Sequence, residues 1–456
     1  MLVWATGKAV RLAWYYPTST VLGVILMLVG IPLHGLGGWW LVGGLTLAVV
    51  VVGFWLWRRD PEVFLTRVRW SRTELRRAYV YAGHWRTVTR LSGLSGDAKG
   101  REYRPKLMRT RSEWWRDRVR VKMIPGQAPE QWELRASGLA HSFGARSCRV
   151  RVVKPSVIEL DFVHADPLAR PLPVPEMAAP GPSVNLKRVQ IGRTETGKPW
   201  TLKLLGGQYL AVGVQGAGKA SILWAVLRAL APALRSGLVR VYGIDPKGGM
   251  ELGQAPELFE GGPVYSNGAE AVELLESLAN EVRERSARFR GILRGWSPQC
   301  GEPFLLLVVD ELADVIAYQT DKRLKERATA ALQTITSQGR APGVAVLGLV
   351  QDPRKEIVPF RNLFTTRIAM RLDEAIQVDM VLGDGVRARG GNAHEIPEST
   401  PGVAWVKEDG KRDPVRARAF HVTDTNITEL QHYVTGTSAT VFAFPETTIT
   451  NGDTAA

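Results

Sequence analysis

Residues 209–231 read YLAVGVQGAGKASILWAVLRALA, and they carry the strongest signal for the fold class of the chain. An apolar strand at residues 209–213 runs directly into a glycine-rich loop, and an apolar helix at residues 222–231 follows without a break. In such a loop, glycines let backbone N–H groups curl around phosphates, and the helix N-terminus adds its positive end. The stretch therefore predicts a phosphate-binding loop. A structural turn is the alternative for the glycines taken alone.

The loop implies a nucleotide site with ATP and Mg²⁺ as its ligands. Its lysine, Lys219, is expected to reach the β- and γ-phosphates. The residues expected to hold the nucleotide are Gly213, Val214, Gln215, Gly216, Ala217, Gly218, Lys219, Ala220 and Ser221.

One position of the loop departs from the usual pattern. The residue after the lysine is usually Ser or Thr, whose hydroxyl binds Mg²⁺, but this chain has Ala220 and then Ser221. One step along a helix turns a side chain by about 100°, so Ser221 can serve only if the first turn is shifted. A water molecule needs no such distortion, since Mg²⁺ normally keeps several waters. We favour the water, and Ser221 is the alternative.

A carboxylate pair ends a second apolar run. Phe304–Val309 is apolar throughout, and Asp310 and Glu311 follow it, which predicts a central parallel strand. At its carboxyl end, Asp310 is expected to hold Mg²⁺ through water and Glu311 to polarise the attacking water. Acidic residues that merely start a helix are the alternative. The upstream Lys219, in the same alternating pattern of strands and helices, favours catalysis.

Three further apolar runs are expected in the same sheet. Val239–Ile244 ends in Asp245-Pro246-Lys247, Val344–Val350 ends in Gln351, and residues 364–372 carry Arg367 and Arg371. The Gln351 amide is expected to sense the γ-phosphate or to place the water. Ring ATPases stabilise phosphoryl transfer with an arginine from a neighbouring subunit. Arg340 and Arg367 are the candidates for that role, and ordinary surface arginines are the alternative.

The chain as a whole is predicted to be α/β. A P-loop (RecA-like) motor with a mostly parallel sheet follows a small α/β module and an N-terminal hairpin of two transmembrane helices. In the module, strands are expected at residues 119–123, 148–153 and 157–162, and a helix at 129–143. The expected parts are a membrane anchor at 1–60, a basic juxtamembrane segment at 61–118, the module at 119–164, a Pro-rich linker at 165–183, the motor at 184–423 and a polar tail at 424–456.

The membrane hairpin is predicted from a long uncharged segment. Residues 17–57 contain no Asp, Glu, Lys or Arg, and one helix of that length would span about twice a bilayer core. Two spans, at residues 18–34 and 39–57, fit better. Basic residues flank both outer ends, which puts both termini in the cytoplasm of a multi-pass protein of the inner (plasma) membrane. A buried hairpin in a soluble protein is the alternative.

The charge distribution indicates an anionic partner, and the cysteines indicate the redox state of the compartment. The formal net charge is +15, and residues 58–122 hold 19 Lys/Arg against 7 Asp/Glu. This basic stretch is expected to meet DNA phosphates or anionic lipid headgroups, unless it is simply a charge-rich surface. Cys148 and Cys300 are far apart and belong to no metal-binding pattern, which fits a reducing cytosol.

Five segments in order resemble the FtsK/SpoIIIE family of DNA pumps. They are IDPKGGMEL at 244–252, VVDELAD at 308–314, QGRAPG at 338–343, TRIAMR at 366–371 and LGDG at 382–385. Residues 119–162 resemble the domain that precedes the motor in that family. Ala220 followed by Ser221 resembles the loop of transfer proteins from actinobacterial conjugative plasmids and integrative elements.

The resemblance implies an ATP-hydrolysing motor whose six copies form a ring around double-stranded DNA. The expected function is membrane-anchored DNA translocation in the conjugative transfer of a mobile element. Chromosome segregation is the competing function within the class. An ATPase of a specialised protein secretion system and a non-hydrolysing membrane scaffold are the alternatives from other classes.

Overall fold

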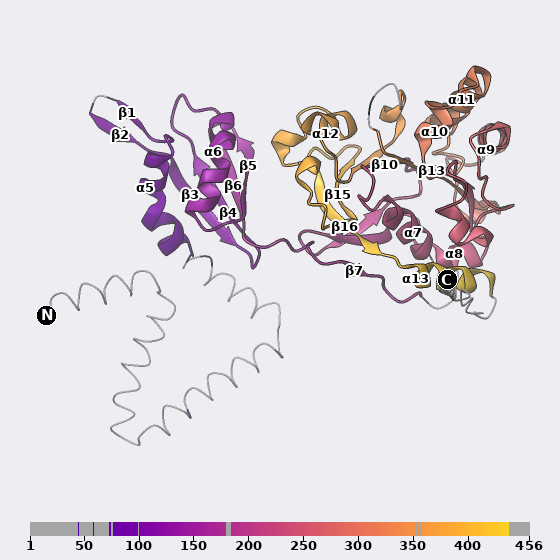
Figure 1. The fold of residues 1–456 in the computed structure, drawn as a ribbon, viewed down its shortest axis with the longest axis horizontal. Helices are drawn as coiled ribbons and strands as arrows, with labels where there is room; N and C mark the ends of the chain where they lie inside the picture. The colour runs from indigo at the N-terminus through magenta and orange to yellow at the C-terminus, as the bar shows by residue number, and fades with distance from the viewer. Residues whose placement is uncertain are drawn as a thin grey trace, which may run out of the picture. The chain divides into compact units, whose positions relative to one another are not determined.

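The computed structural model of the chain describes residues 76–98, 100–178, 184–352 and 358–436, together with the single residues 44, 58, 73 and 354 (Figure 1). These residues form two compact units that divide between Pro167 and Leu168. The expected membrane spans at residues 18–34 and 39–57 fall outside the described part of the chain, except for Gly44. Among the described residues, no helix has both the length and the apolar character that a bilayer crossing requires.

The first unit is a four-stranded antiparallel sheet with helices packed on one face. Its strand order is β3-β4-β6-β5, with bounds Lys106–Ser112, Arg116–Lys122, Val157–Val163 and Ser147–Lys154. The π-helix η1 (Arg76–Ala82) and the α-helices α5 (Gly83–Leu91) and α6 (Pro129–Ser142) bury aromatic side chains against it. A small hairpin of β1 (Gly96–Ala98) and β2 (Arg101–Tyr103) follows α5.

The predicted elements of this unit are present with shifted ends. Helix α6 and strands β5 and β6 match the predictions to within about one residue at each end. The strand expected at residues 119–123 starts earlier, at Arg116. The alternation of basic side chains with buried ones, which marks a strand, extends back to Arg116 and so covers the whole of β4. Residues 76–112, which the sequence assigned to a separate basic segment, lie in the same unit, and Tyr81, Trp85 and Leu94 are buried in its core.

The second unit is built on a ten-stranded sheet in which β10 lies near the centre. Along the sheet the order is β11 (Val239–Ile244), β12 (Phe304–Val309), β13 (Val344–Val350), β10 (Tyr209–Val212), β14 (Thr366–Ala369), β15 (Val403–Glu408), β16 (Val415–His421), β8 (Val189–Thr194) and β9 (Pro199–Leu202). The tenth strand, β7 (Leu172–Pro173), pairs with β16.

The prediction of a mostly parallel sheet is wrong, because the sheet is mixed. Strands β11, β12, β13, β10 and β14 are parallel to one another, whereas β14, β15, β16, β8 and β9 pair in antiparallel fashion. Parallel neighbours need a long crossover, which the helices supply. The pairs β15–β16 and β8–β9 are joined by short turns at Gly410 and Gly197, both with positive φ, and a short turn permits only the antiparallel arrangement.

Helices cover both faces of this sheet, as the alternating pattern predicted. Tyr209 and Ala211 of β10 face the core that contains α7 (Lys219–Ala229) and α8 (Ala231–Arg235). Leu210 and Val212 face the opposite core, to which α9 (Ala269–Phe289), α10 (Leu312–Ile316), α11 (Lys322–Gln338) and α12 (Ala375–Leu382) contribute. Short 3-10 helices lie at Leu252–Gln254, Pro256–Leu258, Pro298–Cys300, Arg361–Leu363, Arg387–Arg389 and Ala393–Glu395.

Regular structure extends beyond the expected ends of the motor. Helix α13 (Asp424–Thr435) occupies residues assigned to a polar tail and packs beside α8 (Figure 1). Thr423 begins it with a capping box shared with Asn426, and Ile427 and Leu430 are buried. Strand β7 likewise lies within the segment assigned to the Pro-rich linker.

Candidate nucleotide site

The glycine loop leaves the carboxyl end of the central strand β10 and is held by its neighbours. Gly213 N–H donates to Val350 O of β13 at 3.1 Å, and Val214 N–H donates to Arg371 O at 3.0 Å. A Cβ atom at Gly213 would lie 2.8 Å from Met370 Cβ. Gly218 has a φ of +91°, and a Cβ there would collide with the backbone of Gly402. Both positions therefore require glycine, Gly213 because of the neighbouring Met370 side chain and Gly218 because of its positive φ and the close backbone of Gly402.

Lys219 is the first residue of α7 and lies over the loop. Its Nζ donates to Gly213 O at 2.7 Å and to Val214 O at 3.3 Å. Burial lowers the pKa of Lys219 to about 8, which Glu311 and Asp310 partly oppose. The ammonium is thus held at the helix N-terminus, where a nucleotide phosphate would bind.

The carboxylate pair lies at the end of β12, two strands from β10, and is buried. Asp310 is 8% exposed and Glu311 is 3% exposed, and burial raises the pKa of both. Glu311 Oε1 accepts from Ala313 N at 3.4 Å, which starts α10, and from Gln351 N at 3.3 Å. Its Oε2 accepts no hydrogen bond from the described residues. This oxygen is available to a ligand such as water.

Lys247 also belongs to the site, although it is not among the residues predicted from the sequence. Its Nζ lies 3.2 Å from Asp310 Oδ2 and 3.5 Å from Glu311 Oε2. Burial acts to lower the pKa of Lys247, but the charges of Asp310 and Glu311 outweigh it and raise this pKa. The signal was available, because Lys247 follows β11 as Asp310 follows β12, and adjacent parallel strands end together.

Asp245 holds the Lys247 segment in place. It is fully buried, and its carboxylate accepts from the backbone N–H groups of Lys247 at 3.2 Å, Glu251 at 2.9 Å and Leu252 at 2.9 Å. With all these donors from its own chain segment, Asp245 fixes the turn after β11. Its role is therefore to position Lys247.

Gln351 and the three arginines lie in different places relative to this site. Gln351 follows β13, and its backbone touches Glu311 while its side chain is exposed. Arg340 is exposed and precedes β13, so it lies at the opposite edge of the sheet, about 20 Å from the carboxyl ends of the strands.

The other two arginines belong to β14 and the residues that follow it. Arg367, inside β14, is half-buried, with Nη2 near Gly383. Arg371, absent from the expected set, donates from Nη2 to Gln215 O at 2.9 Å and from Nη1 to Glu398 Oε1 at 3.1 Å.

Ser221 lies on the side of α7 that faces the turn before β15. A Cβ atom placed on Gly402 would lie 3.9 Å from Ser221 Cβ, and Gly402 N–H itself donates to Ala217 O at 2.9 Å. In the sheet, β15 is on one side of β10, and β12 with Asp310 is on the other. Ser221 is therefore directed toward the strands that do not carry the carboxylates.

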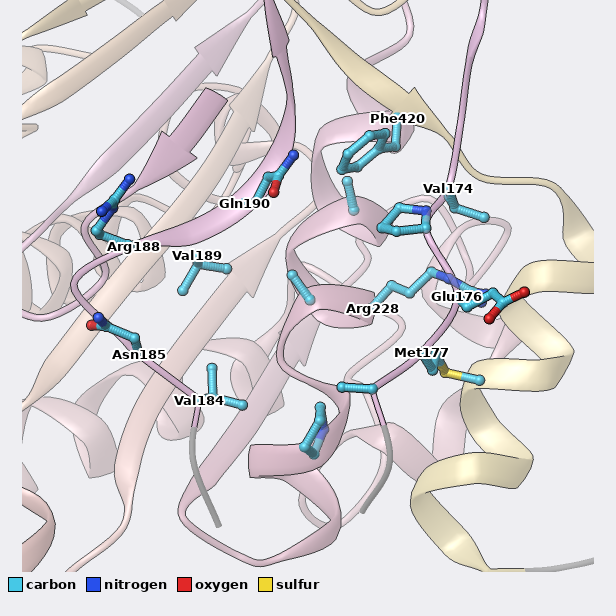
Figure 2. A pocket seen from close by; sticks show the side chains of 15 residues that line it. Val174, Glu176, Met177, Val184, Asn185, Arg188, Val189, Gln190, Arg228 and Phe420 are labelled. Carbon is cyan, nitrogen blue, oxygen red and sulfur yellow. The ribbon is translucent and has the colours of Figure 1, made fainter. Parts of the chain in front are cut away.

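A cavity of about 280 Å³ lies farther along α7 (Figure 2). Arg228, Phe420 and Met177 are among its lining residues. Arg228 is nine residues beyond Lys219, which corresponds to about 14 Å of helix. The cavity is therefore separate from the nucleotide site.

A glycine loop between a buried parallel strand and a helix, with a lysine at the helix start and a carboxylate pair on a nearby strand, defines a P-loop nucleotide-binding domain. Residues 184–294 match the FtsK/SpoIIIE family, and residues 39–164 match the actinomycete conjugal transfer protein N-terminal domain. The chain is therefore an FtsK/SpoIIIE-family protein with an actinomycete conjugal transfer N-terminal domain. The resemblance seen in the sequence is confirmed.

Individual relatives agree with this assignment. The chain is 26% identical over 341 residues to the transfer protein TraSA of Streptomyces ambofaciens, covering 70% of this chain and 79% of that protein. It is 26% identical over 254 residues to the protein Tra of Streptomyces lividans, covering 51% of this chain but 38% of that one. Among solved structures, the pCW3 conjugation coupling protein TcpA, in its monomer form with ATPγS, shares the fold. Its TM-score is 0.50 at 20% identity, and the match covers 76% of this chain and 99% of TcpA.

Proposed function

We propose that this chain is a membrane-anchored, ATP-driven translocase that moves double-stranded DNA during the conjugal transfer of a mobile element, working as a ring of six copies at the inner membrane. The main support for the proposal is that one chain contains both a nucleotide site and a conjugal transfer domain. A P-loop site with Lys219, Asp310 and Glu311 at one edge of the sheet follows a domain of the conjugal transfer type. The relative named as the transfer protein TraSA supports the process.

The residues at the site fit a nucleotide with Mg²⁺. Gly213 and Gly218 let the loop pack against Met370 and Gly402, which would collide with a Cβ atom, and the loop leads into the N-terminus of α7, where Lys219 supplies a cation. Asp310 is the residue that would hold the ion through water. When bound, Mg²⁺ would neutralise charge on the β- and γ-phosphate oxygens.

In the proposed reaction, Lys219 leaves the loop carbonyls and donates to the phosphate oxygens. Glu311 orients the attacking water with Oε2 and takes its proton, while Ala313 N–H and Gln351 N–H hold Oε1 still. Lys247 favours the charged form of the two buried carboxylates, because its ammonium lies close to both and acts to lower their pKa values against the effect of burial. The exposed Gln351 side chain is proposed to contact the γ-phosphate or the water.

An arginine from a neighbouring subunit would complete the site. Arg340 lies at the sheet edge opposite the nucleotide and is exposed, so its own site is out of reach and another copy's site is a natural target. Arg367 is the second candidate, although burial lowers its pKa and β14 holds it between two neighbours. Arg340 is therefore the better supported of the two.

The test is whether duplex DNA accelerates ATP hydrolysis by the full chain purified in detergent. We expect stimulation of several-fold by linear duplex, little by single strands, and none in Lys219→Ala. Hydrolysis that responds to exported protein substrates and ignores DNA would replace the proposal with a secretion ATPase. Loss of plasmid transfer between cells with Glu311→Gln, at unchanged chromosome partition, would separate conjugation from segregation.

A further inference from the structure

The four-stranded sheet of the first unit has two faces of opposite character. One face is covered by helices and buries Val119, Ile158 and Leu160. The other face carries the alternate positions of the same strands, and these are almost all charged. We name it the basic sheet face; its members are Lys106, Arg109, Arg111, Arg116, Arg118, Arg120, Lys122, Arg149, Arg151 and Lys154.

Strand register arranges these side chains in rows across the sheet. In one row Arg109 pairs with Arg120, which pairs with Glu159, which pairs with Arg151. In the next row, Arg111, Arg118, Asp161 and Arg149 follow in the same way. Neighbouring strands are about 4.8 Å apart and the rows about 7 Å apart, so the side chains leave the sheet on a grid with this spacing.

Carboxylates hold part of this grid in place without neutralising it. Arg120 Nε lies 2.8 Å from Glu159 Oε2, and Arg116 Nη1 lies 2.9 Å from Asp161 Oδ2. Glu113, in the turn after β3, pairs with Arg118 at 2.7 Å. Three carboxylates thus face ten basic groups. At the edge strand β3, Arg109 and Arg111 are exposed and form no ion pair with a described side chain.

We propose that the basic sheet face binds the phosphate backbone of duplex DNA, as a contact separate from the motor. This inference rests on the proposed function, which supplies the duplex. Arginine outnumbers lysine seven to three on the face, and its planar fork matches phosphate oxygens in a way that lysine does not. The apolar members of the rows, Val157 and Val163, are buried, and the exposed Met108 and Val153 lie at the bulges of β3 and β5, outside the rows. The rows themselves therefore expose charge without apolar groups, whereas membrane-surface helices combine the two.

A backbone contact of this kind is independent of DNA sequence and depends on salt. Each phosphate neutralised contributes about −0.9 to the slope of log K against log salt concentration. Reversing two phosphate-binding arginines should therefore reduce the magnitude of the slope by about 2.

The test measures fluorescence anisotropy of a labelled 30-base-pair duplex with the full chain, without nucleotide, between 50 and 200 mM salt. The variant is Arg109→Glu with Arg111→Glu. The matched control is Arg90→Glu with Arg135→Glu, because both of these arginines are exposed on α5 and α6, which pack on the opposite face. We expect the face variant to bind at least fivefold more weakly with the smaller slope, and the control to stay within twofold of wild type.

Equal affinity of the face variant and the control would overturn the inference. So would a variant that binds DNA normally but loses binding to vesicles containing one-third phosphatidylserine, because the face would then be a membrane contact. Arg109→Ala with Arg111→Ala should give a smaller loss in the same direction and guards against misfolding of the charge-reversed chain. DNA-stimulated hydrolysis by wild type, alongside unchanged affinity of the face variant, would leave the proposed function standing while this inference fails.

Discussion

Lys247 Nζ lies 3.2 Å from Asp310 Oδ2, across the carboxyl ends of the adjacent strands β11 and β12. Glu311 Oε2 lies 3.5 Å from the same ammonium. One lysine thus faces both buried carboxylates, while Lys219 lies over the glycine loop. The two lysines have pKa shifts of opposite sign, since burial dominates at Lys219 and the carboxylates dominate at Lys247.

Lys247→Met should lower ATP hydrolysis at least tenfold at pH 7. Burial already raises the pKa of Glu311 and Lys247 lowers it, so removing Lys247 should raise this pKa further. A base with a higher pKa is protonated at higher pH, and the acid limb of the rate profile should therefore move upward. Rates measured from pH 5.5 to 9 check this, with Lys247→Arg as the control that keeps the charge. An unmoved acid limb would show that Lys247 does not act on Glu311.

Glu311→Gln should leave ATP binding within about threefold of wild type and slow hydrolysis by about 10²–10⁴, the range for loss of a general base. The amide keeps the shape of the side chain but cannot take a proton. Asp310→Asn should instead weaken Mg²⁺-dependent ATP binding. Equilibrium binding of a fluorescent ATP analogue and single-turnover hydrolysis distinguish the two. Normal hydrolysis by Glu311→Gln would assign the activation of water to another residue.

Ser221→Ala should leave the Mg²⁺ concentration for half-maximal hydrolysis nearly unchanged. Ser221 is directed toward Gly402 and away from the Asp310 side of β10, so water is the expected occupant of the usual hydroxyl position. Ala220→Ser should be tolerated or should slightly lower the Mg²⁺ requirement. Titration of Mg²⁺ at saturating ATP, together with Mn²⁺ binding followed by electron paramagnetic resonance, measures both. A tenfold or larger rise for Ser221→Ala would make Ser221 the ligand.

Arg340→Ala should bind ATP normally yet inhibit wild-type copies in mixed rings. Because Arg340 lies about 20 Å from its own phosphate loop, the proposed contact of Arg340 is with the nucleotide of another subunit. Activity plotted against the fraction of variant should fall below the straight line between the two pure proteins. Arg367→Ala gives the comparison within the same chain. A strictly proportional decline for both would argue against an arginine acting between subunits.

Asp117→Asn should loosen the first unit without touching the nucleotide site. Asp117 is buried and accepts from Arg76 at 2.6 Å and Tyr81 at 2.7 Å. Burial acts to raise the pKa of Asp117, but His164, Ser112 and Arg76 together lower it to about 2. These partners stabilise the folded unit by favouring ionised Asp117. Their contribution is present above the pKa of the unfolded chain, near 4, and is lost as pH falls toward 2.

Removing one partner of a buried pair costs about 3–5 kcal/mol, and the partial exposure of Arg76 reduces the expected loss to about 2–3 kcal/mol. Hydrogen exchange of β4 and β6 amides in the full chain measures it. Asp97→Asn, at an exposed position of β1, is the control. Equal protection in both variants would show that the Asp117 pairs contribute nothing.

The phosphate loop and the carboxylate strand were predictable because their signals are local. A strand, a glycine loop and a helix follow one another within 23 residues at 209–231, and the six apolar residues of β12 end directly in Asp310 and Glu311. Such patterns record backbone conformation and burial along a short piece of chain. The same holds for helix α6 and for strands β5 and β6.

The sequence could not order the strands or pair the side chains between them. Lys247 and Asp310 are 63 residues apart, and only the pairing of β11 with β12 makes them neighbours. Arg371 contacts the glycine loop because β14 pairs with β10. Tertiary structure also divided the sheet into parallel and antiparallel halves. It gathered the basic residues of three strands onto one face, because side chains across a sheet meet according to register, which no local pattern records.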